Sequence, residues 1–197
     1  MINDWTDGLP LPCQYIGIVD LFFYKLSAFF GYYIYLCGIT PNIITFVGLM
    51  LNIFSTWSVY NGYFYYLWSI PLYLLCDTMD GYNSRRYNQG SPFGAAFDHT
   101  ADWIGGVSLI IGSWMRWKLR WEYYILFTII IWIEYKNIVY CGYIQQYNKK
   151  KDIKLSAFFQ TEAKPGQLEN LLYRNRNYNS STVGLLVIVA FYMMEYL

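Results

Sequence analysis

The sequence predicts an all-α integral membrane protein with about five transmembrane helices and one interfacial helix near its N-terminal end. Two observations support this prediction. Apolar residues make up 56% of the chain and aromatic residues 22%, whereas charged residues make up 14%, well below the roughly 25% of soluble domains. In addition, the 51 positions between Lys25 and Asp77 hold no charged residue, which leaves room for two spans of about 20 residues each and a shorter helix.

The charge balance argues against nucleic acid as a partner. The formal net charge is +1 at pH 7, and the sequence has no basic face or arginine-rich helix suited to a phosphate backbone. The four cysteines are scattered without a C-x-x-C pair, which is typical of apolar filler rather than of a zinc site or a disulfide framework. We therefore expect the main partner of the chain to be the membrane.

We divide the chain into an N-terminal segment, 1–40, and a transmembrane domain, 41–197. Within the first, residues 21–38 are apolar but include Lys25, and they end at a glycine that precedes a Thr-Pro pair. Such a stop is typical of a helix end. Because a charge lies inside this helix, the pattern favours a helix in the membrane interface over one that crosses the bilayer.

The transmembrane domain opens with two predicted spans. The first begins at Pro41, a residue suited to a first helical turn, and runs to the turn signal Asn61-Gly62. The second, residues 63–76, leads directly into an aspartate. Pro71 inside this second span predicts a kink, which neighbouring helices tolerate in a membrane.

Three further segments follow. Residues 93–115 carry two aspartates and several glycines, which favours close helix packing and makes a homodimer an expectation. Residues 123–145 form a fourth predicted span, and residues 146–181 read as a polar loop. The last segment, 182–197, has only 16 residues, which is short for a full crossing and leaves a truncated C-terminal end open as an alternative.

The positive-inside rule orients this topology. Three basic residues lie on one predicted side, namely Arg116, Lys118 and Arg120, and ten lie on the other, namely Lys25, Arg85, Arg86, Lys149, Lys150, Lys151, Lys154, Lys164, Arg174 and Arg176. The richer side is expected to face the cytoplasm, which places the aspartates at the cytoplasmic rim of the bilayer.

Four of the eight aspartates in the chain lie between Cys76 and Trp103. Asp77 and Asp80 are three residues apart, and Asp98 and Asp102 are four apart, so each pair lies on one face of a helix. Carboxylates beside hydrocarbon are costly unless a cation neutralises them. Oxygen ligands of this kind suit Mg²⁺ or Mn²⁺, which proteins usually hold together with substrate phosphates.

Two neighbouring residues fit a phosphate ligand. Gly81 follows Asp80 directly and has no side chain to keep a phosphate or nucleotide from the backbone. Arg85 can clamp phosphate oxygens with two parallel hydrogen bonds. Two metal ions bridging a diphosphate could stabilise both the attacking and the leaving oxygen of a displacement reaction.

The stretch resembles the CDP-alcohol phosphatidyltransferases, whose pattern is D-x2-D-G-x2-A-R-x8-G-x3-D-x3-D. Ser84, which replaces the alanine, is the one departure. The opening of the first core helix, residues 41–45, is also similar to the P-N-x-I-T sequence of that family, whereas the resemblance beyond Asp102 is weak. The matching residues are Asp77, Asp80, Gly81, Arg85, Gly94, Asp98 and Asp102.

This resemblance implies a reaction in which an alcohol hydroxyl attacks the phosphorus distal to cytidine and displaces CMP, with no covalent enzyme intermediate. It implies that Asp102 is the general base and also a metal ligand. Gly81 and Arg85 would contact the CDP group, and Asn42 would reach the same site from the first core helix. The implied ligands of two Mg²⁺ or Mn²⁺ ions are Asp77, Asp80, Asp98 and Asp102.

Two branches of the family compete. Phe97-Asp98-His99 with Asp102 resembles the choline and ethanolamine phosphotransferases, which use a CDP-linked alcohol and diacylglycerol. Residues 88–90 and 93–95 resemble phosphatidylinositol synthases, which use CDP-diacylglycerol and inositol; those normally have arginine in place of Trp103 and lack His99. We favour the first branch, in which His99, three residues before Asp102, shares its helix face and a proton.

A non-catalytic membrane protein that keeps the fold is the alternative from another class. The short last segment, Ser84 and the missing C-terminal spans of the choline and ethanolamine branch motivate it. A catalytically dead relative usually loses an aspartate, and all four are present here. The retained aspartates therefore favour an active enzyme.

Overall fold

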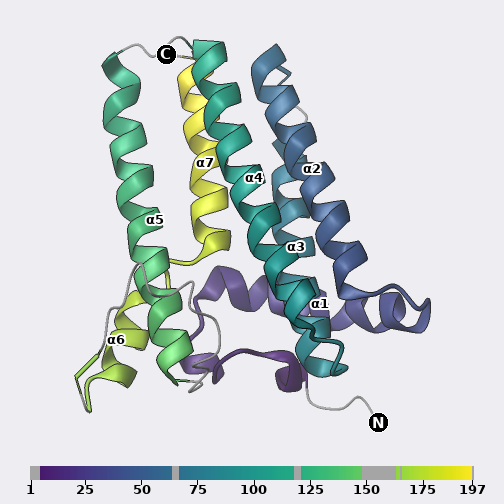
Figure 1. Ribbon diagram of the computed structural model, residues 1–197. Helices are drawn as coiled ribbons and strands as arrows, with labels where there is room; N and C mark the ends of the chain where they lie inside the picture. The colour runs from purple at the N-terminus through teal and green to yellow at the C-terminus, as the bar shows by residue number, and fades with distance from the viewer. Residues whose placement is uncertain (1–4, 64–66, 118–120, 148–162, 165, 197) are drawn as a thin grey trace.

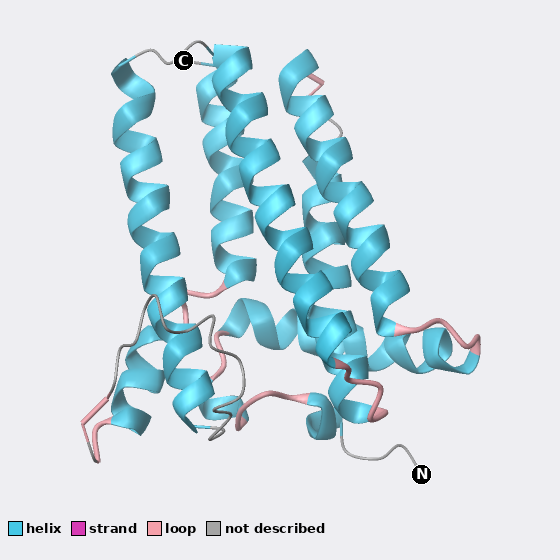
Figure 2. Cartoon of the chain, viewed as in Figure 1, coloured by secondary structure: helices cyan, strands magenta, loops and turns pink. Residues whose placement is uncertain are grey.

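The computed structural model describes residues 5–63, 67–117, 121–147, 163–164 and 166–196, and every regular element within these ranges is a helix (Figure 2). This confirms the predicted all-α fold class. The elements are η1 (Trp5–Gly8), η2 (Cys13–Tyr15), α1 (Ile18–Leu36), α2 (Pro41–Asn61), α3 (Ser69–Arg86), α4 (Pro92–Trp117), α5 (Trp121–Tyr147), α6 (Leu168–Asn175) and α7 (Ser180–Tyr196).

Five long helices, α2, α3, α4, α5 and α7, run side by side, and α1 lies across their lower ends (Figure 1). Helix α2 packs on α3 and α4, α3 also packs on α1 and α7, and α5 packs on α6 and α7. Among the described residues, the helix Pro41–Asn61 is the one long and apolar enough to cross a membrane by length and composition alone. The arrangement places α3 at the centre, in contact with α1, α2 and α7.

Helix α2 has the predicted ends. Pro41 is its first residue, after Thr40 in extended conformation, and Gly62 follows its last residue in the left-handed region, with φ of +76°. Proline suits a first turn because its missing N–H would have had no partner there. Glycine suits the position after the helix because it adopts positive φ without steric cost.

Helix α3 differs from the expected span, residues 63–76. It begins at Ser69 and continues through the aspartates to Arg86, so Asp77 and Asp80 lie within one helix. The predicted kink at Pro71 is wrong, because this proline lies in the first turn of the helix. The N–H groups of the first turn have no intrahelical acceptor, so a proline there, which lacks an N–H, breaks no helix hydrogen bond.

The glycines of α4 confirm the expected close packing. A Cβ atom on Gly105 would lie 2.6 Å from Nδ2 of Asn52, and one on Gly112 would lie 2.8 Å from Cγ2 of Thr56. Both neighbours belong to α2. By contrast, a Cβ on Gly106 would meet no atom within 4 Å. One face of α4 therefore lies directly against α2.

The prediction that residues 146–181 form a loop throughout is wrong, because α6 occupies Leu168–Asn175. Leu168, Leu171 and Leu172 follow the i, i+3, i+4 spacing of an amphipathic helix, and Leu172 has no exposed surface. Helix α6 packs against α5 and η2. A helix of eight residues with polar neighbours gives only a weak periodic signal in the sequence.

Helix α1 is attached to the bundle by polar contacts. Nδ2 of Asn83 on α3 donates to the carbonyl of Gly31 over 3.2 Å. Asp20, on the first turn of α1, accepts hydrogen bonds from the side chain and the backbone of Ser181 at the start of α7. Burial raises the pKa of Asp20 to about 6, and the two bonds from Ser181 oppose the rise.

Candidate active site

The structure brings the four predicted aspartates within electrostatic reach of one another. Asp77 and Asp80 are on α3, and Asp98 and Asp102 are on α4. The carboxylate of Asp77 interacts electrostatically with those of Asp80, Asp98 and Asp102. Asp80, which is buried, interacts with Asp98 and Asp102. The two pairs therefore face a common region, as their spacing predicted.

A tighter group lies on α4 alone. One carboxylate oxygen each from Asp98 and Asp102 and one imidazole nitrogen of His99 lie within 4.8 Å of one another. His99 is exposed at this position, whereas Asp98 is partly buried. Asp77 and Asp80 are outside this compact group. Carboxylate oxygens dominate the donor set, which fits Mg²⁺ or Mn²⁺ better than a soft metal.

Thr45 on α2 holds Asp80. Its hydroxyl donates to Oδ2 of Asp80 and also lies 3.1 Å from the carbonyl of Pro41, one turn earlier in the same helix. A carboxylate is the stronger acceptor of the single hydroxyl proton. The sequence placed Thr45 in the opening motif of α2 but gave it no role.

Tyr73 on α3 contacts the other pair. Its hydroxyl donates to Oδ1 of Asp102 on α4 over 3.0 Å. Tyr73 is four residues before Asp77 and so lies on the same face of α3. This residue is absent from the predicted site. The spacing could have identified Tyr73, because a tyrosine one helical turn before a motif aspartate lies on the same helix face as that aspartate.

The predicted phosphate and nucleotide residues lie at the same end of α3 and α4. Nη1 of Arg85 is 3.2 Å from the position that a Cβ on Gly81 would occupy, and the Arg85 guanidinium interacts electrostatically with Asp98. Oδ1 of Asn42 is 2.7 Å from a Cβ built on Gly94, one turn before Asp98. The structure thus gathers Arg85 and Gly81 and places Asn42 against the start of α4.

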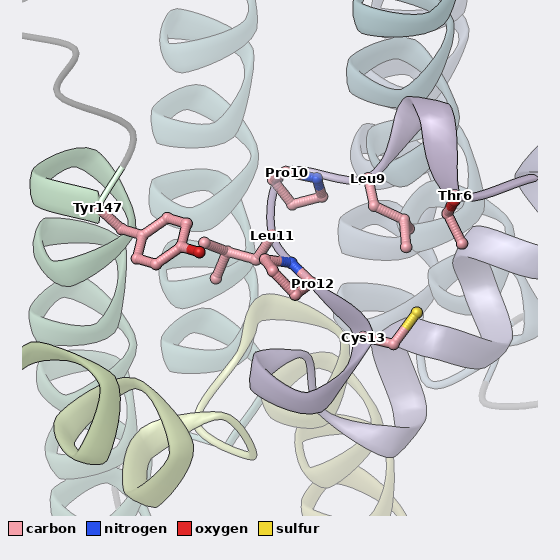
Figure 3. A pocket seen from close by; sticks show the side chains of 7 residues that line it. All are labelled: Thr6, Leu9, Pro10, Leu11, Pro12, Cys13 and Tyr147. Atoms are coloured by element: carbon pink, nitrogen blue, oxygen red, sulfur yellow. The ribbon is translucent and has the colours of Figure 1, made fainter.

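Two hollows lie apart from this group. One of about 500 Å³ is lined by residues of the N-terminal segment from Thr6 to Cys13 and by Tyr147 (Figure 3). A second of about 500 Å³ is lined entirely by apolar residues of α1, α3 and α7, among them Phe22, Leu75 and Leu185. Leu75 is two residues before Asp77, so this apolar hollow adjoins the helix that carries two of the aspartates.

The family model of the CDP-alcohol phosphatidyltransferases matches residues 38–195. The chain belongs to the CDP-alcohol phosphatidyltransferase family. This confirms the resemblance inferred from the aspartate motif. CDP-alcohol phosphatidyltransferases are membrane transferases, and the match includes all four aspartates, Gly81, Arg85 and Asn42. The N-terminal residues 1–37, which include η1, η2 and α1 up to Leu36, lie outside it.

Curated relatives come from two branches of this family. Cholinephosphotransferase 1 of Xenopus laevis is 32% identical over 125 residues, covering 55% of this chain and 30% of the relative. The protein of the same name from Rattus norvegicus is 29% identical over the same shares. A CDP-diacylglycerol–inositol 3-phosphatidyltransferase of Drosophila melanogaster is 30% identical over 71 residues, covering 36% of this chain and 32% of that protein.

These alignments span less than a third of the length of each relative. No solved structure matches the chain. The comparisons therefore establish the family to which this chain belongs.

Proposed function

We propose that this chain transfers a phospho-alcohol group from CDP-choline or CDP-ethanolamine to the hydroxyl of diacylglycerol and releases CMP. The observation that carries the proposal is the close grouping of Asp98, His99 and Asp102 on α4, with the carboxylates of Asp77 and Asp80 on α3 within electrostatic reach of Asp98 and Asp102, inside the matched family motif. In this reaction a bond forms between the acceptor oxygen and the phosphorus distal to cytidine. The bond from that phosphorus to the bridging oxygen breaks, and its electron pair leaves with CMP.

The residues divide the work of this displacement. Arg85 binds phosphate oxygens of the donor, and Gly81 lets the diphosphate approach the backbone of α3. Asp77, Asp80, Asp98 and Asp102 would hold Mg²⁺ or Mn²⁺, which would neutralise charge on the diphosphate when bound. Asp102 takes the proton of the acceptor hydroxyl while Tyr73 fixes the orientation of its carboxylate. His99, one turn before Asp102, passes that proton toward solvent.

The proposed place in the membrane follows from the helix ends. Helices α2, α3, α4, α5 and α7 cross the bilayer, and α1 lies in the cytoplasmic interface. Helix α1, which carries Lys25, and α6, which carries Arg174, lie at the lower ends of the long helices in Figure 1, and the last turn of α3 carries Arg85 and Arg86. Arg116 lies at the opposite end, beside Gly62. Lys118, Arg120 and residues 149–154 lie outside the described residues. A homodimer stays a prediction.

The apolar hollow supports a lipid substrate. It lies between the interfacial helix α1 and the bilayer helices α3 and α7, where acyl chains of diacylglycerol would lie in hydrocarbon-like surroundings. Asp77 and Asp80 lie in the polar second half of the same helix α3. A lipid hydroxyl and a water-soluble CDP donor can therefore reach one site from two sides.

An inositol-using enzyme is the second candidate. The alignment with the Drosophila inositol phosphatidyltransferase and the Asn88-Gln89-Gly90 sequence favour it. Longer alignments with cholinephosphotransferases and the presence of His99 favour the first candidate. A non-catalytic protein that keeps the fold is the third.

A single assay separates these candidates. Purified protein with Mg²⁺ is given CDP-choline or CDP-ethanolamine plus diacylglycerol in one reaction and CDP-diacylglycerol plus inositol in another, and CMP release is measured. We expect release in the first reaction and none from Asp102→Asn. Release only in the second reaction would assign the inositol branch. Release in neither would assign the non-catalytic alternative.

A further inference from the structure

The N-terminal turn, residues Trp5–Gly8, lies outside the family match and yet contacts the motif helix α3 directly. The carbonyl of Gly8 accepts a hydrogen bond from Nε of Arg85 over 2.8 Å. The carbonyl of Trp5 accepts one from the hydroxyl of Tyr82 over 2.9 Å. Both bonds join residues 77 positions apart in sequence. The N-terminal turn is thus hydrogen-bonded to α3 at two residues, Tyr82 and Arg85, which lie about one helical turn apart.

The fit between this turn and α3 is tight. Gly8 is buried, and a Cβ there would lie 2.4 Å from Cε2 of Tyr82. Tyr82 has no exposed surface, and its hydroxyl also accepts a hydrogen bond from Nη1 of Arg86 over 2.7 Å. Any side chain larger than that of glycine at position 8 would therefore push the turn away from the ring.

These contacts fix the direction of Arg85. Its Nε is occupied by Gly8, its guanidinium lies over the ring of Tyr24 at 5.9 Å, and its Nη1 is close to Gly81. The guanidinium also interacts electrostatically with Asp98. Nη1 and Nη2 lie 3.2 and 3.5 Å from the position of a Cβ on Gly81, which directly follows Asp80, and the side chain is also hydrogen-bonded to Tyr24. An arginine held in this way loses less conformational freedom when it binds a phosphate.

We propose that the N-terminal turn is a positioning element that orients Arg85 toward the diphosphate of the CDP-linked donor. The inference rests on the proposed function, in which Arg85 contacts that diphosphate. The turn itself touches no substrate. It acts through the two carbonyl bonds, and its effect is on the affinity for the nucleotide rather than on the chemical step.

The test uses the full purified chain with Mg²⁺ and CDP as the probe, with binding measured by calorimetry. Gly8→Ala moves the turn, and Tyr82→Phe removes the hydroxyl and its bonds to Trp5 and Arg86 while keeping the buried ring. Tyr82→Phe therefore still tests the role of the turn if the Gly8→Ala variant does not fold. We expect both variants to raise the Kd of CDP about five- to tenfold, the scale of one charge-assisted hydrogen bond. The KM of the CDP donor should rise with it, with kcat changed less than about twofold.

Two controls separate positioning from general damage. Gly106→Ala, whose added methyl group meets open space, should leave the Kd of CDP unchanged. In an Arg85→Lys background, which has no Nε to bond Gly8, the Gly8→Ala change should have no further effect. An equal loss in that background would overturn the proposal, as would unchanged CDP binding by both variants.

CDP binding and CMP release, measured together, distinguish the positioning role of the turn from the proposed reaction. If the wild type releases CMP but the variants bind CDP normally, the positioning role fails and the enzymatic function stands. If the wild type binds CDP, the variants lose affinity and no CMP is released, the positioning role stands and the proposed reaction fails. If the wild type does not bind CDP, both are wrong.

Discussion

The hydroxyl of Tyr73 on α3 donates a hydrogen bond of 3.0 Å to Oδ1 of Asp102 on α4. This bond links the proposed general base to the helix that carries Asp77 and Asp80. A carboxylate has two oxygens that both accept hydrogen bonds, so a donor on one oxygen restricts the rotation of the whole group. The orientation of Asp102 therefore depends on the relative placement of α3 and α4.

Tyr73→Phe removes this donor and keeps the ring. We expect kcat for CMP release to fall about tenfold, because the general base loses its fixed orientation, while the KM of the CDP donor changes less than about twofold. Steady-state kinetics with saturating diacylglycerol measure both. Equal kcat values for the variant and the wild type would remove Tyr73 from the mechanism.

Thr45→Val replaces the hydroxyl that holds Asp80 by a methyl group of similar size. We expect the Mg²⁺ concentration for half-maximal activity to rise about tenfold or more, because a partner that orients a metal ligand tunes its affinity. Activity should vanish after chelation and return on titration with Mg²⁺ or Mn²⁺. Thr45→Ser keeps the donor and is the matched control. A normal Mg²⁺ titration of Thr45→Val would show that Asp80 needs no such support.

Gly105→Ala places a methyl group 2.6 Å from Nδ2 of Asn52, between α4 and α2. Because α2 and α4 must move apart to relieve this overlap, we expect a loss of about 1–3 kcal/mol in the free energy of unfolding. Gly106→Ala, one residue away and facing open space, should change it by less than about 0.5 kcal/mol. Thermal unfolding in detergent, followed by tryptophan fluorescence, compares the two. Similar stability of both variants would contradict the close packing of α2 and α4.

Asp20→Asn tests the attachment of α1 to α7. Burial raises the pKa of Asp20 to about 6 in the folded protein, from an ordinary value of 3.8. The folded state thus holds this proton more tightly, so the contribution of Asp20 to stability is present below about pH 4 and is lost as the pH rises through 6. We expect the difference in Tm between Asp20→Asn and the wild type to change over that window and to level off above it. Asp7→Asn, at an exposed carboxyl, provides the comparison. A constant difference across the window would contradict the buried state of Asp20.

The sequence by itself determined the helical fold class, the ends of α2 and the helix face that each pair of aspartates shares. Pro41 and Gly62 specify the ends of α2 through local backbone preferences, and the spacings of Asp77 with Asp80 and of Asp98 with Asp102 put each pair on one helix face. Hydropathy did not show where α3 ends, because its polar second half stays helical through contacts with α1 and α2.

Only the tertiary structure decided which side chains support the site. Tyr73 and Asp102 are 29 residues apart, Thr45 and Asp80 are 35 apart, and Gly8 and Arg85 are 77 apart. Each bond joins different elements, and its existence depends on how far one helix is shifted and rotated against another. That register is set by packing over whole helix faces, such as the contact of Gly105 with Asn52, and no local spacing rule encodes it.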